Sequence, residues 1–156
     1  MVGTMNAKDA IRGSAAECFV TIEGKRYNFM QAINLEASIE KNKTEVPILG
    51  RTGKGNKSTG WTGSGSATFH YNTSIFRELL LRYKNTGEDV YFDIQVTNED
   101  KTSSAGRQTV ILKDCNVDGG LLAKFDADED YVDEDMDFTF EDFEIPETFA
   151  LLAGME

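Results

Sequence analysis

A glycine-rich stretch with three basic residues is the first candidate for chemistry in this sequence. Residues 50–66 read GRTGKGNKSTGWTGSGS, and Gly50 and Gly55 have the spacing of the two glycines in a phosphate-binding loop. The pattern breaks at Asn56, which stands where the lysine of such a loop should follow directly. A phosphate-binding loop must also lead into a helix, whereas a strand-like segment follows here. We therefore expect no nucleotide site.

The acid-rich run DADED at 126–130 begins like a calcium-binding loop. An EF-hand loop then needs glycine at its sixth position and glutamate at its twelfth, where this sequence has Tyr131 and Asp137. No helical pattern flanks the run, so we expect no dedicated metal site. Carboxylates are so abundant in this region that no pair stands out as a general acid and base.

Histidine and cysteine offer no further catalytic pattern. His70 is the only histidine and has no evident nucleophile beside it, so a structural role is the simpler interpretation. Cys18 and Cys115 lie far apart inside strand-like apolar runs, which predicts buried free thiols and no metal spacing. The sequence therefore predicts a protein that is not an enzyme and needs no cofactor.

The charge of the chain is divided unevenly. The net charge is −11, yet all 16 Lys and Arg residues lie within residues 1–124, and residues 126–147 hold 12 acids and no base. Nucleic-acid binding needs clustered Lys and Arg, so this balance argues against it. The 156 residues, 40% of them apolar, suffice for one domain with a core. No segment has the length of a membrane span or the apolar core of a signal peptide, which predicts synthesis in the cytoplasm.

Hydrophobic periodicity predicts mostly strands. Residues 17–40 give two strands around a turn at 23–25, and the second alternates apolar and polar residues from Phe29 to Ile39. The segments 66–71, 90–96 and 108–117 also read as strands. Near the end of the chain, aromatic and apolar residues alternate with acids, which predicts a strand with one acidic face. Its apolar side is formed by Met136, Phe138 and Phe140.

One helix is expected at 73–86, where apolar residues recur with helical spacing and Gly87 is placed to end the helix. The fold class is therefore mainly β (α+β): a small antiparallel β-barrel or sandwich with one packed helix. We divide the chain into an N-terminal arm (1–16), a β domain (17–149) and a C-terminal tail (150–156).

Residues 46–66 are predicted to be a long loop inside this domain. Such a loop is unusual in a compact domain unless it is functional. Trp61, between flexible glycines, is a natural anchor for a partner. We therefore interpret 46–66 as an assembly loop that becomes ordered against another subunit.

The stretch EVPILGRTGKGNKSTGWTGSGSATFHYNTSIFRELLLRY resembles the tail tube proteins of contractile-tailed phages, defective prophages and phage-tail-like bacteriocins of Gram-positive bacteria. The residues that match the family pattern in the proposed assembly loop are Val46, Pro47, Gly50, Gly60, Trp61, Gly63 and Gly65, and His70 ends the strand after them. The closing run DEDMDFTFEDFEI also resembles the last strand of the family. The resemblance covers roughly residues 17–149.

This resemblance implies a structural subunit of a tail tube, with a fold shared with the tube of type VI secretion. Six copies would form a ring, and rings would stack into a hollow tube inside a contractile sheath. The loop would reach a neighbouring ring. The implied partners are further copies of the chain, the sheath protein, baseplate or initiator proteins and the tape measure protein. The implied location is the tail of a virion or of a bacteriocin.

The acidic region has a possible role in such a tube. A lumen that passes DNA must not hold it, so an acidic lining would let DNA slide through without specific binding. The candidate lumen acids are Glu36, Glu40, Asp133, Asp135 and Asp137. The alternative is that these acids form a solvated outer face near the sheath.

Two other functions remain open from the sequence. A type VI-like or extracellular contractile injection system would use the same fold for protein cargo. A monomeric ligand-binding β-barrel would instead stay monomeric at high concentration and leave the glycine-rich loop mobile.

Overall fold

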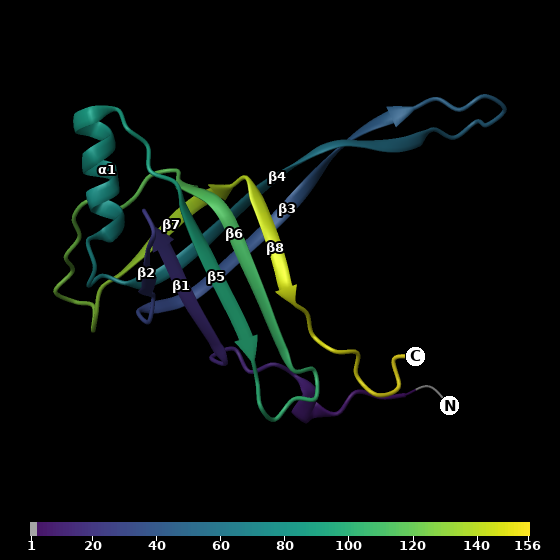
Figure 1. The fold of residues 1–156 in the computed structure, drawn as a ribbon, viewed down its shortest axis with the longest axis horizontal. Helices are drawn as coiled ribbons and strands as arrows, with labels where there is room; N and C mark the ends of the chain where they lie inside the picture. The colour runs from purple at the N-terminus through teal and green to yellow at the C-terminus, as the bar shows by residue number, and fades with distance from the viewer. Residues whose placement is uncertain (1–2) are drawn as a thin grey trace.

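The computed structural model describes residues 3–156 as one open antiparallel sheet of eight strands with a single α-helix (Figure 1). The elements in chain order are η1 (Ala7–Asp9), β1 (Ala16–Ile22), β2 (Lys25–Asn28), β3 (Ala32–Val46), β4 (Gly55–His70), α1 (Ile75–Thr86), β5 (Phe92–Glu99), β6 (Arg107–Val117), β7 (Asp133–Phe140) and β8 (Asp142–Glu147). The strand order across the sheet is β2-β1-β5-β6-β7-β4-β3, and β8 also pairs with β6.

Strand β6 joins two differently oriented halves of the sheet. Most of β6 pairs with β5 and β8, whereas its last residues, Asn116 and Val117, pair with β7. The strand bends at Asp114, whose φ of 54° accompanies a register shift against β5. The strands at the two edges, β2 and β3, do not pair with each other. The predicted fold class, mainly antiparallel β with one packed helix, is confirmed, but the sheet is bent and does not close into a complete barrel.

The core lies between the two halves of the sheet and α1. The rings of Phe29, Phe69 and Phe76 contact one another, and Phe92 contacts Phe76, all at tilted or edge-on angles and with centroid separations of 5.0 to 5.7 Å. Phe138 of β7 is 0% exposed and belongs to the same cluster. Burying one such side chain contributes about 1.5–3 kcal/mol, so this cluster holds the two halves together.

Helix α1 closes one side of the core. It ends as predicted at Gly87, whose φ of 73° is left-handed and whose N–H donates to the carbonyl of Tyr83 at 2.7 Å. Of the apolar stripe expected on the helix, only Phe76 is fully buried, and Tyr83 is half exposed. The guanidinium of Arg77 forms an ion pair with the buried carboxylate of Glu134 on β7. This pair fixes the helix to the strand that carries the acidic face.

The long strand expected from Phe29 to Ile39 is interrupted. The chain turns at residues 29–31 between β2, which pairs with β1, and β3, which pairs with β4. The side chain of Phe29 is buried in the core, and its N–H donates to the carbonyl of Cys18 at 2.8 Å. Alternation continues through this turn, so the pattern alone gave no sign of it.

The predicted assembly loop at 46–66 is also wrong in extent. Strand β3 continues to Val46 and β4 begins at Gly55, so the loop itself spans only residues 47–54. Residues 55–66 form ladder hydrogen bonds with β3 despite their glycines. Together β3 and β4 make a long hairpin whose far end projects from the rest of the molecule (Figure 1).

Candidate assembly interface

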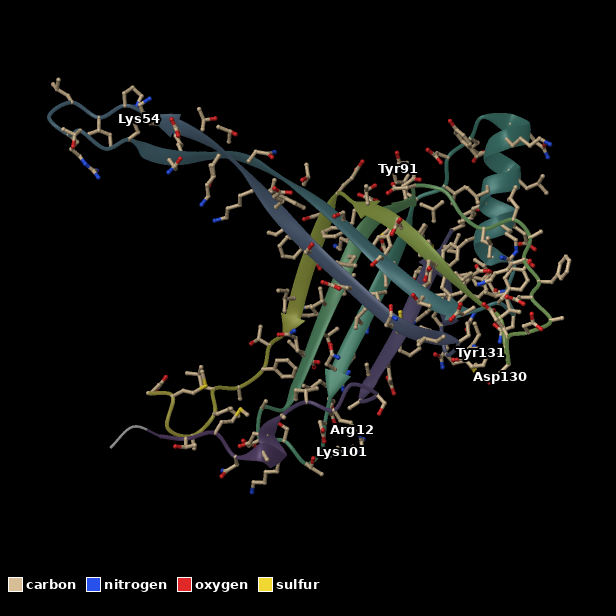
Figure 2. The ribbon with its side chains drawn as sticks, turned by 180° about the vertical axis from the view of Figure 1, so that it is seen from behind. Arg12, Lys54, Tyr91, Lys101, Asp130 and Tyr131 are labelled. Carbon is tan, nitrogen blue, oxygen red and sulfur yellow. The ribbon has the colours of Figure 1, made fainter. Side chains whose placement is uncertain are left out.

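The projecting part of the β3–β4 hairpin is a two-stranded ribbon without support from a third strand. We call residues 40–62 the arm. Its strands pair from Glu40 and Thr62 out to Val46 and Gly55, whereas the pairing of β4 with β7 begins only at Gly63. Every residue of the arm is exposed except Gly55, which is half buried. Figures 1 and 2 show the arm extending well beyond the sheet.

The arm differs from the rest of the chain in charge. It holds five of the 16 basic residues and two of the 27 acidic ones, a net charge of +3, which leaves −14 on the remainder. Lys54 lies near the far end of the arm (Figure 2) and faces Glu45 at 3.7 Å. The loop at this end also exposes Ile48 and Leu49. The end of the arm is therefore basic and apolar at once.

Trp61 lies at the base of the arm and not at its tip. Its ring contacts Phe143 of β8 edge to face, with centroids 5.6 Å apart, and Phe140 of β7 at 6.2 Å. These contacts leave 38% of Trp61 exposed. In the isolated chain the tryptophan therefore fixes the root of the arm to the body, and its remaining surface faces outward.

Gly63 and Gly65 of the glycine-rich pattern are strand residues that lie beneath aromatic rings of β7. A Cβ at Gly63 would lie 2.4 Å from the ring of Phe140. A Cβ at Gly65 would lie 2.5 Å from the ring of Phe138 and 2.8 Å from the carbonyl oxygen of Glu36. Glycine is needed at both positions because another group approaches the backbone closely, and not for loop flexibility.

The remaining residues of the predicted loop lie along the arm. Val46 and Pro47 stand where β3 ends, Gly50 has a left-handed φ of 82° in the loop, and Gly60 lies in β4 near the root. The arm thus contains Trp61 and four of the other predicted loop residues: Val46, Pro47, Gly50 and Gly60. Gly63 and Gly65 belong to the body.

The face of β3, β4 and β7 that points away from the core carries only polar side chains in three successive rows. Residues paired directly across strands share a face, and these rows are Asn34–Thr68–Asp135, Glu36–Ser66–Asp137 and Ser38–Ser64–Thr139. The opposite, core-side face of β7 carries Met136, Phe138 and Phe140, all buried as the alternation predicted. We call the outer surface the acid–hydroxyl face.

All five candidate lumen acids lie on this face or at its ends. Glu36, Asp135 and Asp137 are exposed on it, and the hydroxyl of Thr68 donates to Asp135 at 2.6 Å. Glu40 continues the row of β3 into the base of the arm. Asp133 lies at the far end of β7, where the ammonium group of Lys124 is 3.7 Å away.

Sequence reasoning missed the serine and threonine hydroxyls that complete the acid–hydroxyl face. Ser64, Ser66 and Thr68 alternate with Gly65 and Ala67 in β4, so their period of two was the available signal. The assignment of these residues to a loop concealed it. The serine and threonine side chains are short, so the longer carboxylate side chains beside them extend further from the sheet.

The candidate metal-binding and catalytic groups of the sequence can be placed within residues 3–156. No group of three or more His, Cys, Asp or Glu residues among them is placed to hold a metal. Burial raises the pKa of Cys18 to about 11 and that of Cys115 to about 12, so both thiols stay protonated at neutral pH. Neither thiol is therefore activated as a nucleophile. His70 packs edge to face against Tyr131, with centroids 5.3 Å apart.

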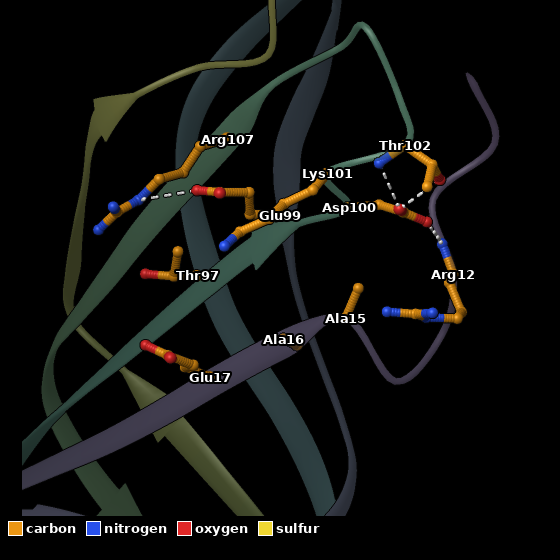
Figure 3. A pocket seen from close by; sticks show the side chains of 10 residues that line it. All are labelled: Arg12, Ala15, Ala16, Glu17, Thr97, Glu99, Asp100, Lys101, Thr102 and Arg107. Atoms are coloured by element: carbon orange, nitrogen blue, oxygen red, sulfur yellow. Dashed lines mark hydrogen bonds and ion pairs between the residues drawn. The ribbon is translucent and has the colours of Figure 1, made fainter. Parts of the chain in front are cut away.

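One hollow of about 460 Å³ lies between the N-terminal segment and the ends of β1, β5 and β6 (Figure 3). Three of its charged side chains, those of Asp100, Glu99 and Arg107, form contacts within the protein. The carboxylate of Asp100 accepts from the backbone N–H of Arg12 and from the N–H and hydroxyl of Thr102. Arg107 lies close to Glu99 (Figure 3). The hollow is thus a junction that fastens the N-terminal segment to the sheet.

No helix within the described residues has the length and apolar character needed to cross a membrane.

Comparison with known proteins places this geometry among tube proteins. The chain matches the protein family described as Phage tail tube protein over residues 3–147. It is 38% identical over 146 residues to the Phage-like element PBSX protein XkdM of Bacillus subtilis. The matched residues cover 94% of this chain and 97% of that protein.

Two solved assemblies share the fold at low sequence identity. The SPP1 tail tube, determined by solid-state NMR and cryo-EM, superposes with a TM-score of 0.62 at 10% identity, over 87% of this chain and 78% of its own. A chain of the sheath–tube complex of the extracellular contractile injection system PVC, in its extended state, gives a TM-score of 0.55 at 12% identity. That match covers 82% of this chain and 86% of the other.

Proposed function

The chain belongs to the phage tail tube protein family and is a structural tail tube subunit of a phage or phage-like particle, and from this premise we propose that six copies close into a ring and that rings stack into a hollow tube. The open sheet supports ring closure, because β2 and β3 each have a neighbouring strand on one side only. Unpaired strand edges bind further strands, and repeated edge pairing between copies closes a ring when the rotation allows it.

The arm links one ring to the next in this proposal. The single observation that carries it is the unsupported ribbon at 40–62, which projects from the sheet with nearly all of its side chains exposed. An isolated two-stranded hairpin is marginally stable in water, so the arm gains its order from a neighbouring subunit. Trp61, still 38% exposed at the root, is available for the same contact.

The acid–hydroxyl face lines the lumen of the tube. This face bears Glu36, Asp135 and Asp137 without a basic residue in its three rows, and it lies opposite the core side on which α1 packs. A negative lining repels phosphate, so DNA slides past without being bound. Glu40 and Asp133 extend this charge at the two ends of the face.

The partners follow from the tube. We assign the chain a place inside a contractile sheath, with baseplate or initiator proteins at one end and the tape measure protein in the lumen. The likeness to a chain of the PVC sheath–tube complex supports a sheath through the shared fold. The role requires no catalysis. The open sheet lacks the enclosed interior that a monomeric ligand-binding barrel would need.

Sedimentation and negative-stain electron microscopy of the concentrated chain, alone and beside a tail initiator complex, test the assembly. We expect hexameric rings or hollow tubes. A chain that stays monomeric at every concentration, and forms no tubes with the initiator, would contradict the proposal.

Charge reversal tests the lumen. Asp135→Lys with Asp137→Lys should slow DNA ejection from a genome-carrying particle and leave killing by a DNA-free particle largely intact. The matched control reverses two exposed acids elsewhere, Glu17 and Asp89. Acids that point outward in the assembled tube, or unchanged ejection from the Asp135 and Asp137 variant, would refute the lumen assignment.

A further inference from the structure

Two exposed apolar sites lie far apart on this molecule. Among the described residues, the two most exposed large apolar side chains are Leu49, at 102%, and Phe125, at 94%. Leu49 belongs to the loop that ends the arm. Phe125 belongs to the β6–β7 loop (118–132), which also exposes Leu122 and Tyr131. Exposed apolar clusters of this kind mark surfaces that bind another protein.

The two sites carry opposite charge. The end of the arm, residues 46–57, holds three basic residues and no acid. The β6–β7 loop holds five acids and one base, Lys124, whose ammonium group is already 4.0 Å from Glu129. Within the described chain, Arg51 and Lys57 form no ion pair. Opposite charges around matching apolar groups give a contact its orientation and its rate of formation.

The two sites cannot meet within one chain. Lys54 lies at one end of the long axis of the molecule, and Asp130 and Tyr131 lie at the other (Figure 2). A contact between such different surfaces of two identical chains runs head to tail and repeats from copy to copy. That is the symmetry a stacked tube requires.

We propose that the end of the arm of one copy docks on the β6–β7 loop of a copy in the adjacent ring, with Leu49 against Phe125 and with Arg51 and Lys57 beside Asp128 and Asp130. The inference rests on the proposed function, in which the arm links rings, and adds the surface that receives it. The contact covers both exposed apolar sites and neutralises part of the acidic charge of the body.

A charge swap tests the pairing. Arg51→Glu with Lys57→Glu should reduce the mass of sedimentable tubes by about tenfold or more, because like charges then face each other. Asp128→Lys with Asp130→Lys should do the same, and the combination of all four changes should restore tubes to within about twofold of the unmodified chain. Lys84→Glu, on α1, is the matched control and should change little. Loss of tubes in both pairs without restoration in the combination would overturn the docking surface but leave the role of the arm in place.

Disulfide trapping tests the same contact directly. A chain with both Leu49→Cys and Phe125→Cys should give a ladder of covalent oligomers when its tubes are oxidised mildly at pH 8. Its two natural thiols, with their pKa values of about 11 and 12, do not compete at that pH. Leu49→Cys with Leu151→Cys, another exposed position, is the control and should give no ladder. Tubes of the first variant without a ladder would refute the proposal, whereas failure of the unmodified chain to form tubes would refute the proposed function as well.

Discussion

The two halves of the β3–β4 hairpin have the same backbone pairing but different surroundings. In the inner half, residues 63–70 of β4 pair with β7 on their second side, and Gly63 and Gly65 lie under the rings of Phe140 and Phe138. In the outer half, residues 55–62 have only β3 as a neighbour and bury almost nothing. Both halves therefore share the same ladder hydrogen bonds, but only the inner half also packs against the core.

This contrast has an energetic consequence. A hydrogen bond makes a net contribution of about 0.5–1.5 kcal/mol to stability. The entropy lost in ordering each residue offsets this contribution. The inner half adds the burial of aromatic rings, and the outer half does not. We therefore expect the arm to depend on a neighbouring subunit for its order, and the body to be independent of the arm.

The strongest test of this independence removes the arm. Lys41 and Trp61 are paired across the hairpin, so residues 42–60 can be replaced by Asn-Gly, the preferred two-residue turn. We expect the urea midpoint of unfolding to stay unchanged, because no core residue is lost. We expect tubes to disappear entirely in sedimentation and electron microscopy. Tubes of normal length from this variant would show that the arm is not needed for stacking.

Two glycines of β4 sharpen the comparison within one strand. Gly65→Ala should lower the free energy of unfolding by about 1–3 kcal/mol, because the new Cβ meets both the ring of Phe138 and a backbone carbonyl. Gly60→Ala is the matched control in the arm, where the nearest atom, on Asn42, would be 3.9 Å away. Its stability should equal or slightly exceed that of the unmodified chain in urea denaturation. Equal losses from both variants would contradict the distinction between the two halves.

Trp61 lies at the boundary between the halves and should show an intermediate effect. Trp61→Ala removes two aromatic contacts, each worth about 0.5–1.5 kcal/mol, with Phe140 and Phe143. We expect modest destabilisation of the body in urea and a larger loss of tube formation, because the root of the arm is released. Tyr91→Ala, at another half-exposed aromatic residue, is the control and should leave tubes intact. Normal tubes from Trp61→Ala would remove the tryptophan from the interface.

The N-terminal segment is a second extension, and unlike the arm it is fastened within its own chain. Asp9 accepts hydrogen bonds from the N–H and hydroxyl of Ser104, and Asp100 accepts from Thr102 and from the N–H of Arg12. These bonds hold the pKa of both carboxyls below their usual 3.8.

The sign of these shifts predicts a pH effect on this segment. A carboxylate with a lowered pKa stabilises the folded state above its ordinary pKa, and that contribution is lost as the pH falls through the lowered value. We expect the amide NMR signals of Arg12 and Ser104 to titrate with a midpoint below 3.8. Asp100→Asn should loosen the contact with Arg12 at neutral pH. A midpoint at or above 3.8 would contradict the fastening.

Much of the body was predictable because its signals are local. The alternation of Phe138 and Phe140 with acids identified both faces of β7, and Gly87 marked the end of the helix. The tail tube class came from the resemblance to a known family, which the Gly-Trp-x-Gly-x-Gly pattern around Trp61 carries. These features depend on residues within a few positions of each other.

The rest depends on contacts that are distant along the chain. Gly63 and Gly65 read as a loop because their reason for being glycine is a pair of rings on β7, more than 70 positions away. Glu134 lies on the core side of β7, among apolar residues, because Arg77 of the helix neutralises it. Hydrophobic periodicity could not show that the sheet stays open, because closure depends on whether β2 pairs with β3.

Hydrogen–deuterium exchange of the arm, measured in isolated subunits and in assembled tubes, tests the central claim most directly. The account predicts that the amides of residues 40–62 exchange rapidly in the subunit, while those of residues 63–70, paired with β7, are protected. In tubes the arm should become protected to a similar degree, because a neighbouring ring then covers it. Equal exchange of the arm in both states, whether fast or slow, would contradict the claim that a neighbouring subunit orders it.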